Sequence, residues 1–283
     1  MNRILIVGGT GRVGREVLAQ LTPLGVTVRA LVRDPANAQL PPHVEAVFGD
    51  LTRPETLDSC INGVDAVFLV WTAPPATLAP ALKKILKNGP RIVFLSAPHK
   101  TPHPFFQQPN PIAVLHAQIE QIIEASVCQW TFLRPGMFAA NALGWWAPRL
   151  RTGADLVRWP YAAAPTAPID ERNAAVAIRA LCHNGHAGAE NVLTGPQSLT
   201  QSEQLSIIGD AIGRPLRMEE MFPDETRREW RDFMPPSVTD MLLNAWAAAI
   251  GQPAFVTSTV EEITGAPART FRDWARDHAA AFR

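Results

Sequence analysis

The stretch "RILIVGGTGRVG", residues 3–14, decides the fold, because a strand and a helix meet there across a glycine turn. Residues 3–7 form a continuous apolar run with β-branched members, which is typical of a strand buried on both faces. Residues 13–21 then show the apolar spacing of a helix, and the glycines between let a dinucleotide pyrophosphate approach backbone N–H groups at the helix N-terminus. A purely structural turn is the alternative, which the surrounding βαβ pattern disfavours. We therefore predict a dinucleotide-binding loop formed by Gly8, Thr10, Gly11, Arg12, Val13 and Gly14.

Short apolar runs recur through the first half of the chain and alternate with segments of helical spacing. Strands are expected at 26–32, 44–48, 64–70, 91–96 and 130–134, and the clearest helices at 78–87 and 113–125. Apolar strands separated by helices imply a parallel sheet covered on both faces. The fold class predicted is α/β, a doubly wound parallel Rossmann sheet with a smaller, mainly helical C-terminal lobe.

Prolines and tryptophans break this pattern after residue 134, and helical segments dominate the rest of the chain. We expect an NAD(P)-binding Rossmann domain over residues 1–150 and a C-terminal lobe for substrate or partner over residues 151–283. A strand near 190–195 is expected to return to the main sheet, which would make the two intertwined.

Composition limits the possible partners. The chain has 283 residues, 47% of them apolar, with 26 Lys and Arg against 26 Asp and Glu. Such a chain can fill a large core and has no net charge to attract nucleic acid or an anionic membrane. Cys60, Cys128 and Cys182 form no CxxC pair, so neither a disulfide framework nor a metal site is indicated. We expect a cytoplasmic monomer or homodimer that binds neither nucleic acid nor membrane.

The end of the second expected strand bears on the choice of dinucleotide. An acidic residue there usually binds the ribose 2′-OH of NAD, whereas a basic one accommodates the 2′-phosphate of NADP. Here the strand ends in Arg33, and Arg12 projects from the glycine loop, so two guanidinium groups can chelate a phosphate. Asp34 is the competing candidate, because a shift of one residue would make it a ribose ligand. The pattern favours NADP(H) over NAD(H).

Two further strand ends are expected to contact the cofactor. Asp50 and Leu51 follow the third strand and are placed at the adenine edge, although Asp50 could be a plain turn residue. Trp71 and Thr72 follow the fourth strand and are expected beside the cofactor, because ligands bind at the carboxyl ends of parallel strands.

Several stretches beyond the glycine loop resemble one protein family. They are "ALVRDP" (30–35), "GDL" (49–51), "WTFLRPGMFAAN" (130–141) and the tail "TGAPARTFRDWARDH" (264–278). Together they resemble the NmrA-like branch of the atypical short-chain dehydrogenases/reductases over essentially the whole chain, and the tail resembles reductases related to the ergot-alkaloid iminium reductases. The resemblance implies an NADPH-dependent quinone or iminium reductase. Its alternative implication is a non-catalytic NADP(H) sensor that binds a protein partner.

The catalytic Y-x-x-x-K pair of the wider superfamily is absent. Glu120 resembles the Glu that follows the family's Lys by four, which places His116 at the Lys position and Ile112 at the Tyr position. Tyr161 is the only tyrosine, and no lysine follows residue 100. Losing a general acid costs about 10²–10⁴ in rate, which only an already activated acceptor tolerates. We therefore expect a small planar quinone or iminium acceptor, or no reaction.

The remaining site candidates come from strand ends and from the resemblance. His116 and Ser96 are candidates for catalysis and for cofactor contact; otherwise His116 is a helix-surface residue and Ser96 caps a turn. The resemblance places Pro135, Gly136, Met137 and Phe138 along the nicotinamide. On the substrate side we expect a partly aromatic wall, although paired tryptophans are as often core, formed by His99, Asn141, Trp145, Trp146 and Tyr161.

Overall fold

The computed structural model describes residues 3–183 and 185–283, which divide into two compact units. Unit 1 comprises Met1–Ala97, Ala113–Arg134 and Glu171–Asn191, and unit 2 comprises Pro98–Ile112, Pro135–Asp170 and Val192–Arg283. Each unit is thus assembled from three separate segments, whereas the sequence suggests one boundary near residue 150. The return of a strand near residues 190–195 to the main sheet is expected from the sequence and is confirmed, whereas the other crossings depend on which distant segments pack together.

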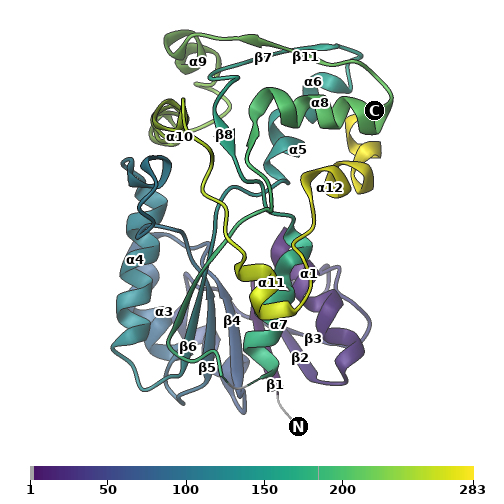
Figure 1. Cartoon of the computed structure of the whole chain (residues 1–283). Coiled ribbons are helices and arrows are strands. Elements are labelled where there is room, and N and C mark those ends of the chain that lie inside the picture. Colours follow the sequence, from purple (N-terminus) through teal and green to yellow (C-terminus); the bar gives the residue numbers. More distant parts are fainter. Residues whose placement is uncertain (1–2, 184) are drawn as a thin grey trace. The chain divides into compact units, whose positions relative to one another are not determined.

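A seven-stranded parallel sheet organises the Rossmann part of the chain (Figure 1). Its order is β3-β2-β1-β4-β5-β6-β9, which confirms the doubly wound fold class. The strands are β1 (Arg3–Val7), β2 (Thr27–Val32), β3 (Val44–Phe48), β4 (Ala66–Val70), β5 (Arg91–Leu95), β6 (Trp130–Pro135) and β9 (Ala189–Leu193). Because the order reverses beside β1, the carboxyl ends of β1 and β4 flank the position where such sheets bind ligands.

Helices cover both faces of the sheet, as Figure 1 shows for α3 and α4 on one side and α1 and α7 on the other. One face packs on α2 (Leu57–Ile61), α3 (Leu78–Ile85) and α4 (Pro111–Glu124), with Leu5 and Val7 of β1 in the same apolar cluster. The alternate residues Ile4 and Ile6 are equally buried and point to the opposite face. That face carries α1 (Arg12–Leu21) and α7 (Ala175–Cys182).

The position of α7 corrects an expectation from the sequence, which assigned its residues to the C-terminal lobe. In the structure α7 belongs to unit 1, where it packs against α1 and against β4 and β5. Its buried side chains include Val176, Ala177 and Ile178. These residues supply apolar cover that the first 135 residues leave incomplete, which explains why the chain returns to the sheet.

Unit 2 combines small sheets with helices around an aromatic core. β7 (Leu156–Trp159) pairs in parallel with β11 (Arg217–Glu220), and β8 (Pro165–Thr166) pairs antiparallel with β10 (Leu199–Thr200). The helices are α5 (Asn141–Trp145), α6 (Ala147–Leu150), α8 (Gln201–Ile212), α9 (Pro223–Glu229), α10 (Pro236–Ala249), α11 (Thr259–Thr264) and α12 (Phe271–Asp277). Short 3₁₀ turns add η1 (Thr22–Leu24), η2 (Pro54–Thr56), η3 (Pro75–Thr77) and η5 (Glu171–Ala174) in unit 1, and η4 (Pro104–Gln107) and η6 (Ala279–Phe282) in unit 2.

A buried charge cluster ties α4 to the edge of the sheet. Arg134 binds Glu120 through two bonds, Nε to Oε1 at 2.9 Å and a second guanidinium nitrogen to Oε2 at 2.6 Å, and it also pairs with Glu190 of β9. The side chains of Arg134 and Glu120 are only 3% and 2% exposed. Burial lowers the pKa of Arg134, but the hydrogen bonds that its guanidinium donates to Glu120 and Glu190 outweigh that effect and raise the pKa. Glu120, the residue by which the sequence locates the missing catalytic pair, is therefore held in a structural role.

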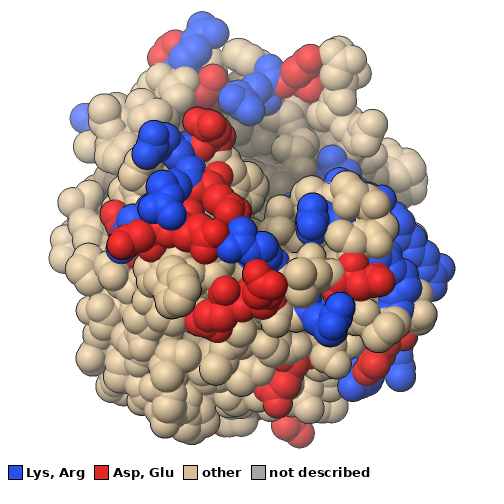
Figure 2. Space-filling view, turned by 90° about the horizontal axis from the view of Figure 1, so that it is seen from above, with Lys and Arg blue, Asp and Glu red and all other residues tan. Residues whose placement is uncertain are grey.

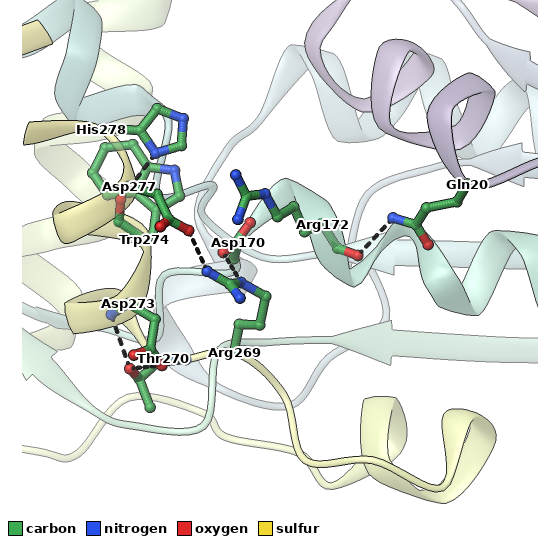
Figure 3. A network of polar contacts seen from close by, with 9 residues as sticks. All are labelled: Gln20, Asp170, Arg172, Arg269, Thr270, Asp273, Trp274, Asp277 and His278. Carbon is green, nitrogen blue, oxygen red and sulfur yellow. Dashed lines mark hydrogen bonds and ion pairs between the residues drawn. The ribbon is translucent and has the colours of Figure 1, made fainter. Parts of the chain in front are cut away.

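The C-terminal tail is anchored within unit 2 by a polar network (Figure 3). The guanidinium of Arg269 lies between the carboxylates of Asp170 and Asp277, and its Nε donates to the buried Asp170 at 2.7 Å. Thr270 and Asp273 form a reciprocal capping box at the start of α12.

No helix among the described residues is long and apolar enough to cross a membrane.

Candidate functional site

A cleft of about 420 Å³ lies in unit 1 at the carboxyl ends of β1 to β4. Its walls come from the glycine loop and from the residues that follow the four strands. The lining residues are Val7, Gly8, Thr10, Gly11, Leu31, Val32, Arg33, Gly49, Asp50, Leu51, Thr52, Val70, Thr72, Ala73 and Pro74. The lining includes seven residues that the sequence predicts to bind the cofactor: Gly8, Thr10, Gly11, Arg33, Asp50, Leu51 and Thr72.

The loop geometry requires glycine at two positions. Gly8 has φ +85°, and a Cβ added there would lie 2.9 Å from Val70 Cβ. A Cβ on Gly14 would lie 2.1 Å from the Gly8 carbonyl oxygen, so α1 can approach β1 this closely only without a side chain. The resulting wall is bare backbone at a helix N-terminus, which fits a dinucleotide pyrophosphate.

The charges around the cleft favour a phosphate on the ribose. Arg33 lines the cleft, but Asp34 does not. The carboxylate of Asp34 instead accepts hydrogen bonds from Asn37, at 2.7 Å from Nδ2 and 3.3 Å from the backbone N–H, and the Nδ2 bond holds the pKa of Asp34 below its usual range. Asp50 accepts two bonds from Thr52, each 2.8 Å long, and these bonds, with a smaller contribution from Arg33, lower its pKa. A cation rather than a carboxylate thus follows β2 into the cleft.

Other predicted cofactor residues lie outside this lining, among them Gly14, Arg12, Val13 and Trp71. Arg12 is the exposed first residue of α1, and Val13 is half-buried beside it. Trp71 is 6% exposed, and its ring packs in the core under the sheet while its Nε1 donates to Ala73 O at 2.8 Å. Its ring gains from burial in the adjoining core, while its chain neighbours Val70 and Thr72 line the cleft, so the place of Trp71 beside the cofactor stays a prediction.

Ser96 and His116 both lie in unit 1. Ser96 follows β5, and its buried Oγ has no hydrogen-bond partner among the described residues. His116 is half-buried on α4, with its ring edge-to-face with Phe94 at a centroid distance of 5.5 Å. Because buried hydroxyl groups normally find a partner, the free Oγ of Ser96 makes it a candidate ligand contact.

Unit 2 contains a separate apolar hollow, which we call the aromatic hollow. It is lined by His103, Phe105, Phe106, Gly136, Met137, Pro165, Thr166, Ala167, Thr194, Ala254 and Phe255. Gly136 and Met137 were expected beside the nicotinamide, whereas the three phenylalanines were missed. The pair "FF" in a proline-rich loop was the available signal, but nothing local links it to Phe255, which lies about 150 positions further along the chain.

Several residues expected at the nicotinamide or the substrate do not line the aromatic hollow. Pro135 is buried at the end of β6, and Phe138 forms a bridge with Ile169. Trp146 has no exposed surface and packs T-shaped on Trp159, so its assignment to a pocket wall is wrong: it belongs to the core. Also outside the lining are Trp145, which borders a second cleft on the same unit, the half-buried Asn141, Tyr161 and His99.

The surface of unit 2 has mixed charge. Figure 2 shows basic and acidic side chains interleaved on the face that it presents. Arg158, for example, contacts Glu219, Glu225 and Glu229 together. Side chains arranged in this way largely neutralise one another, so this network supplies no field of one sign to attract a polyanion.

Comparisons with known proteins agree with this geometry. Residues 8–145 match a family model described as NAD(P)H-binding. Over 99% of both chains, the sequence is 37% identical to a (4-alkanoyl-5-oxo-2,5-dihydrofuran-3-yl)methyl phosphate reductase of Streptomyces griseus, and 34% identical to an NAD(P)H azoreductase of Xenophilus azovorans. The chain belongs to the same family as these two reductases and has an NAD(P)H-binding domain.

The fold is likewise shared with solved structures. An NADPH-dependent quinone oxidoreductase of Escherichia coli superposes with a TM-score of 0.80 over 99% of this chain and 100% of that one, at 22% identity. A triphenylmethane reductase of Citrobacter superposes with a TM-score of 0.80 over 98% of this chain and 99% of that one, at 18% identity. Together with the full-length reductase relatives, the family match shows an NAD(P)H-binding oxidoreductase.

Proposed function

We propose that this member of the family is an NADPH-dependent reductase that transfers a hydride to a small, activated planar acceptor, a quinone or an iminium ion. The observation that carries the proposal is that unit 1 has an intact nucleotide cleft and that unit 2 has an aromatic hollow whose lining contains neither tyrosine nor lysine. An acceptor handled in this way must already be electron-poor, because nothing in the lining replaces the missing Tyr and Lys.

Each part of the nucleotide cleft is assigned to one part of NADPH. Backbone N–H groups of residues 8–14 hold the pyrophosphate, and Arg33, helped by Arg12, binds the 2′-phosphate. Asp50 and Leu51 contact the adenine edge, and Thr72 lies along the cofactor. Ser96 Oγ and His116 are the candidate polar contacts for the reactive end, because one is buried without a partner and the other is a half-buried imidazole.

We assign the binding of the acceptor to the aromatic hollow of unit 2. Bound NADPH supplies the hydride, so the protein has to orient a flat ring and exclude water around it. Phe105, Phe106 and Phe255 offer ring surfaces suited to a planar molecule, and the rings would have to move apart to admit one, because the hollow has a volume of about 10 Å³. The named substrates of the Streptomyces and Xenophilus reductases, an unsaturated butenolide and an azo compound, support an acceptor with a conjugated, polarised double bond.

The decisive experiment follows the loss of NADPH absorbance with a panel of quinones and cyclic iminium ions, with NADH as the parallel donor. We expect turnover with at least one acceptor and a preference for NADPH. Tight NADPH binding without turnover on any acceptor would overturn the proposal and leave an NADP(H) sensor. Equal use of NADH would remove the role assigned to Arg33 while leaving the reductase in place.

A further inference from the structure

The wall of the nucleotide cleft that follows β4 is irregular backbone. β4 ends at Val70 and η3 begins at Pro75, and the cleft is lined in between by Thr72, Ala73 and Pro74. The main-chain groups of a strand or helix are held by the hydrogen bonds of that element, whereas a connecting segment needs other partners to keep one conformation. The partners of this segment therefore decide how rigid this wall of the cleft is.

Two successive carbonyl groups of this segment accept hydrogen bonds from neighbouring residues. The indole Nε1 of Trp71 donates to Ala73 O at 2.8 Å. Thr77 donates to Pro74 O, at 2.8 Å from Oγ1 and at 3.1 Å from the backbone N–H. The ring of Pro74 restricts its φ, which is −58°, and Pro75 restricts the residue before it. The backbone of this segment is consequently set by Trp71 on one side and by Thr77 on the other.

The two anchors differ in how firmly they are held themselves. Trp71 is 6% exposed and belongs to the apolar core cluster that includes Leu78 and Leu82 of α3. A ring packed in this way fixes the position and direction of its N–H, which can only donate. Thr77 is half-buried, and its bond stays within a single turn. Trp71 is therefore the anchor that connects this wall of the cleft to the core of unit 1.

The strand order indicates which part of NADPH this wall would face. In the order β3-β2-β1-β4 the glycine loop follows β1, Arg33 and Asp50 follow β2 and β3 on one side of it, and Thr72 follows β4 on the other. The end of β4 adjoins the loop directly, since a Cβ on Gly8 would lie 2.9 Å from Val70 Cβ. A dinucleotide whose pyrophosphate lies on the glycine loop has its adenosine half over β2 and β3 and its nicotinamide half from β4 onward. The wall after β4 therefore belongs to the nicotinamide half of the site.

We infer that Trp71 is a positioning residue for the nicotinamide half of NADPH. Its indole N–H holds Ala73 O, which keeps the wall from Thr72 to Pro74 in the conformation that binds this half of the cofactor. The inference rests on the proposed function, because it concerns the same cofactor. Without this hydrogen bond the wall occupies other conformations as well, and the observed affinity for NADPH falls with the fraction of molecules that remain competent to bind.

The first test is Trp71→Phe, which removes the N–H and keeps most of the ring in the core. We expect this variant to bind NADPH about five- to tenfold more weakly, the value of one neutral hydrogen bond. Adenosine 2′,5′-bisphosphate carries the adenosine half and the 2′-phosphate but no nicotinamide, so the variant should bind it as the wild type does. Both dissociation constants are measured by isothermal titration calorimetry. Unchanged NADPH affinity, or an equal loss for the two ligands, would overturn the inference.

Trp130→Phe is the matched control, because it makes the same change in the same core. Trp130 is half-buried, packs against the cluster that contains Trp71, and stacks on Phe132 at a centroid distance of 4.1 Å. Its substitution should leave both dissociation constants unchanged, and urea unfolding checks that both variants are folded. A selective loss of NADPH affinity in Trp130→Phe as well would assign the effect to core packing and refute the role of the Trp71 N–H.

The second anchor of the wall allows an independent test. Thr77→Val removes the Oγ1 bond to Pro74 O but keeps the backbone bond, so NADPH affinity should fall by only about two- to threefold, again without effect on the bisphosphate. Thr77→Ser keeps the hydroxyl and should have the wild-type affinity. A loss in Thr77→Ser as large as that in Thr77→Val would contradict a wall that is held by these hydrogen bonds.

The proposed function and the role of Trp71 fail in different experiments. A wild type that binds NADPH but reduces no acceptor overturns the reductase proposal alone, and the titrations still decide the role of Trp71. A wild type that binds neither NADPH nor the bisphosphate overturns both.

Discussion

The nucleotide cleft of unit 1 and the aromatic hollow of unit 2 are built in opposite ways. The cleft is shaped by backbone: a left-handed glycine, a helix start and four strand ends that follow one another along the first 74 residues. The hollow is shaped by side chains from segments near residues 103–106, 136–137, 165–167, 194 and 254–255. A backbone site leaves a short sequence signature, whereas a side-chain site assembled from distant segments leaves none.

We expect the largest effect on the free energy of unfolding when a buried charge of unit 1 is removed, and a much smaller effect when an exposed charge of unit 2 is removed. Arg134→Met should lower the free energy of unfolding by about 3–5 kcal/mol, because Glu120 is left buried without its partner. Arg158→Met, which removes a guanidinium 40% exposed and bound to three surface carboxylates, should cost at most about 1 kcal/mol. Urea unfolding of both variants measures the contrast. Similar losses would show that the exposed network is as important as the buried one.

The backbone character of the cleft is tested by Gly14→Ala. The added Cβ would lie 2.1 Å from a carbonyl oxygen, so the loop must shift and NADPH affinity should fall by about 100-fold or more. Gly144→Ala in unit 2 is the matched control, since a Cβ there meets nothing within 4 Å. The NADPH dissociation constants of both variants are measured from the change in NADPH fluorescence on titration. Unchanged affinity in Gly14→Ala would mean that the loop does not hold the pyrophosphate.

The next effect is expected from Arg33, the arginine that lines the cleft. Arg33→Ala should weaken NADPH binding by about 10- to 100-fold, as for the loss of charge-assisted hydrogen bonds, and should change NADH binding little. Arg53→Ala serves as control, because Arg53 pairs with Glu55 outside the cleft lining. The two dissociation constants are measured by the same titration. Equal weakening of NADH would show that Arg33 supports the loop and does not read the 2′-phosphate.

The smallest effect concerns the cap of α12 in unit 2. Thr270→Ala should lower the free energy of unfolding by about 1 kcal/mol at neutral pH. The Thr270 hydrogen bond holds the pKa of Asp273 below its usual range, so the contribution is present above the unfolded-state pKa and is lost as the pH falls through the folded-state pKa. The difference in the free energy of unfolding between variant and wild type, measured with urea, should therefore decrease as the pH is lowered. A difference that does not change with pH would mean that the substitution acts through helix propensity alone.

The elements of unit 1 and the predominance of helices in unit 2 were predictable from the sequence, whereas the short strands of unit 2 were not. Strands such as Arg3–Val7 and Ala66–Val70 are apolar on both faces, so their pattern is independent of what covers them. The parallel pair β7 and β11 joins residues about 60 positions apart, and β11 reads "RMEE", which has no strand periodicity. Trp146 likewise has the composition of a pocket residue but becomes core, because its neighbours in space are Trp145 and Trp159.

The sequence by itself determined the Rossmann fold, the dinucleotide loop, the cation after β2 and the absence of a Tyr/Lys pair, because each is written in adjacent residues whose local geometry has few solutions. Only the tertiary structure decided that α7 completes the sheet and that three phenylalanines and Thr166 share one hollow. These depend on packing between segments far apart in the chain, where burial and hydrogen-bond partners outweigh local preference.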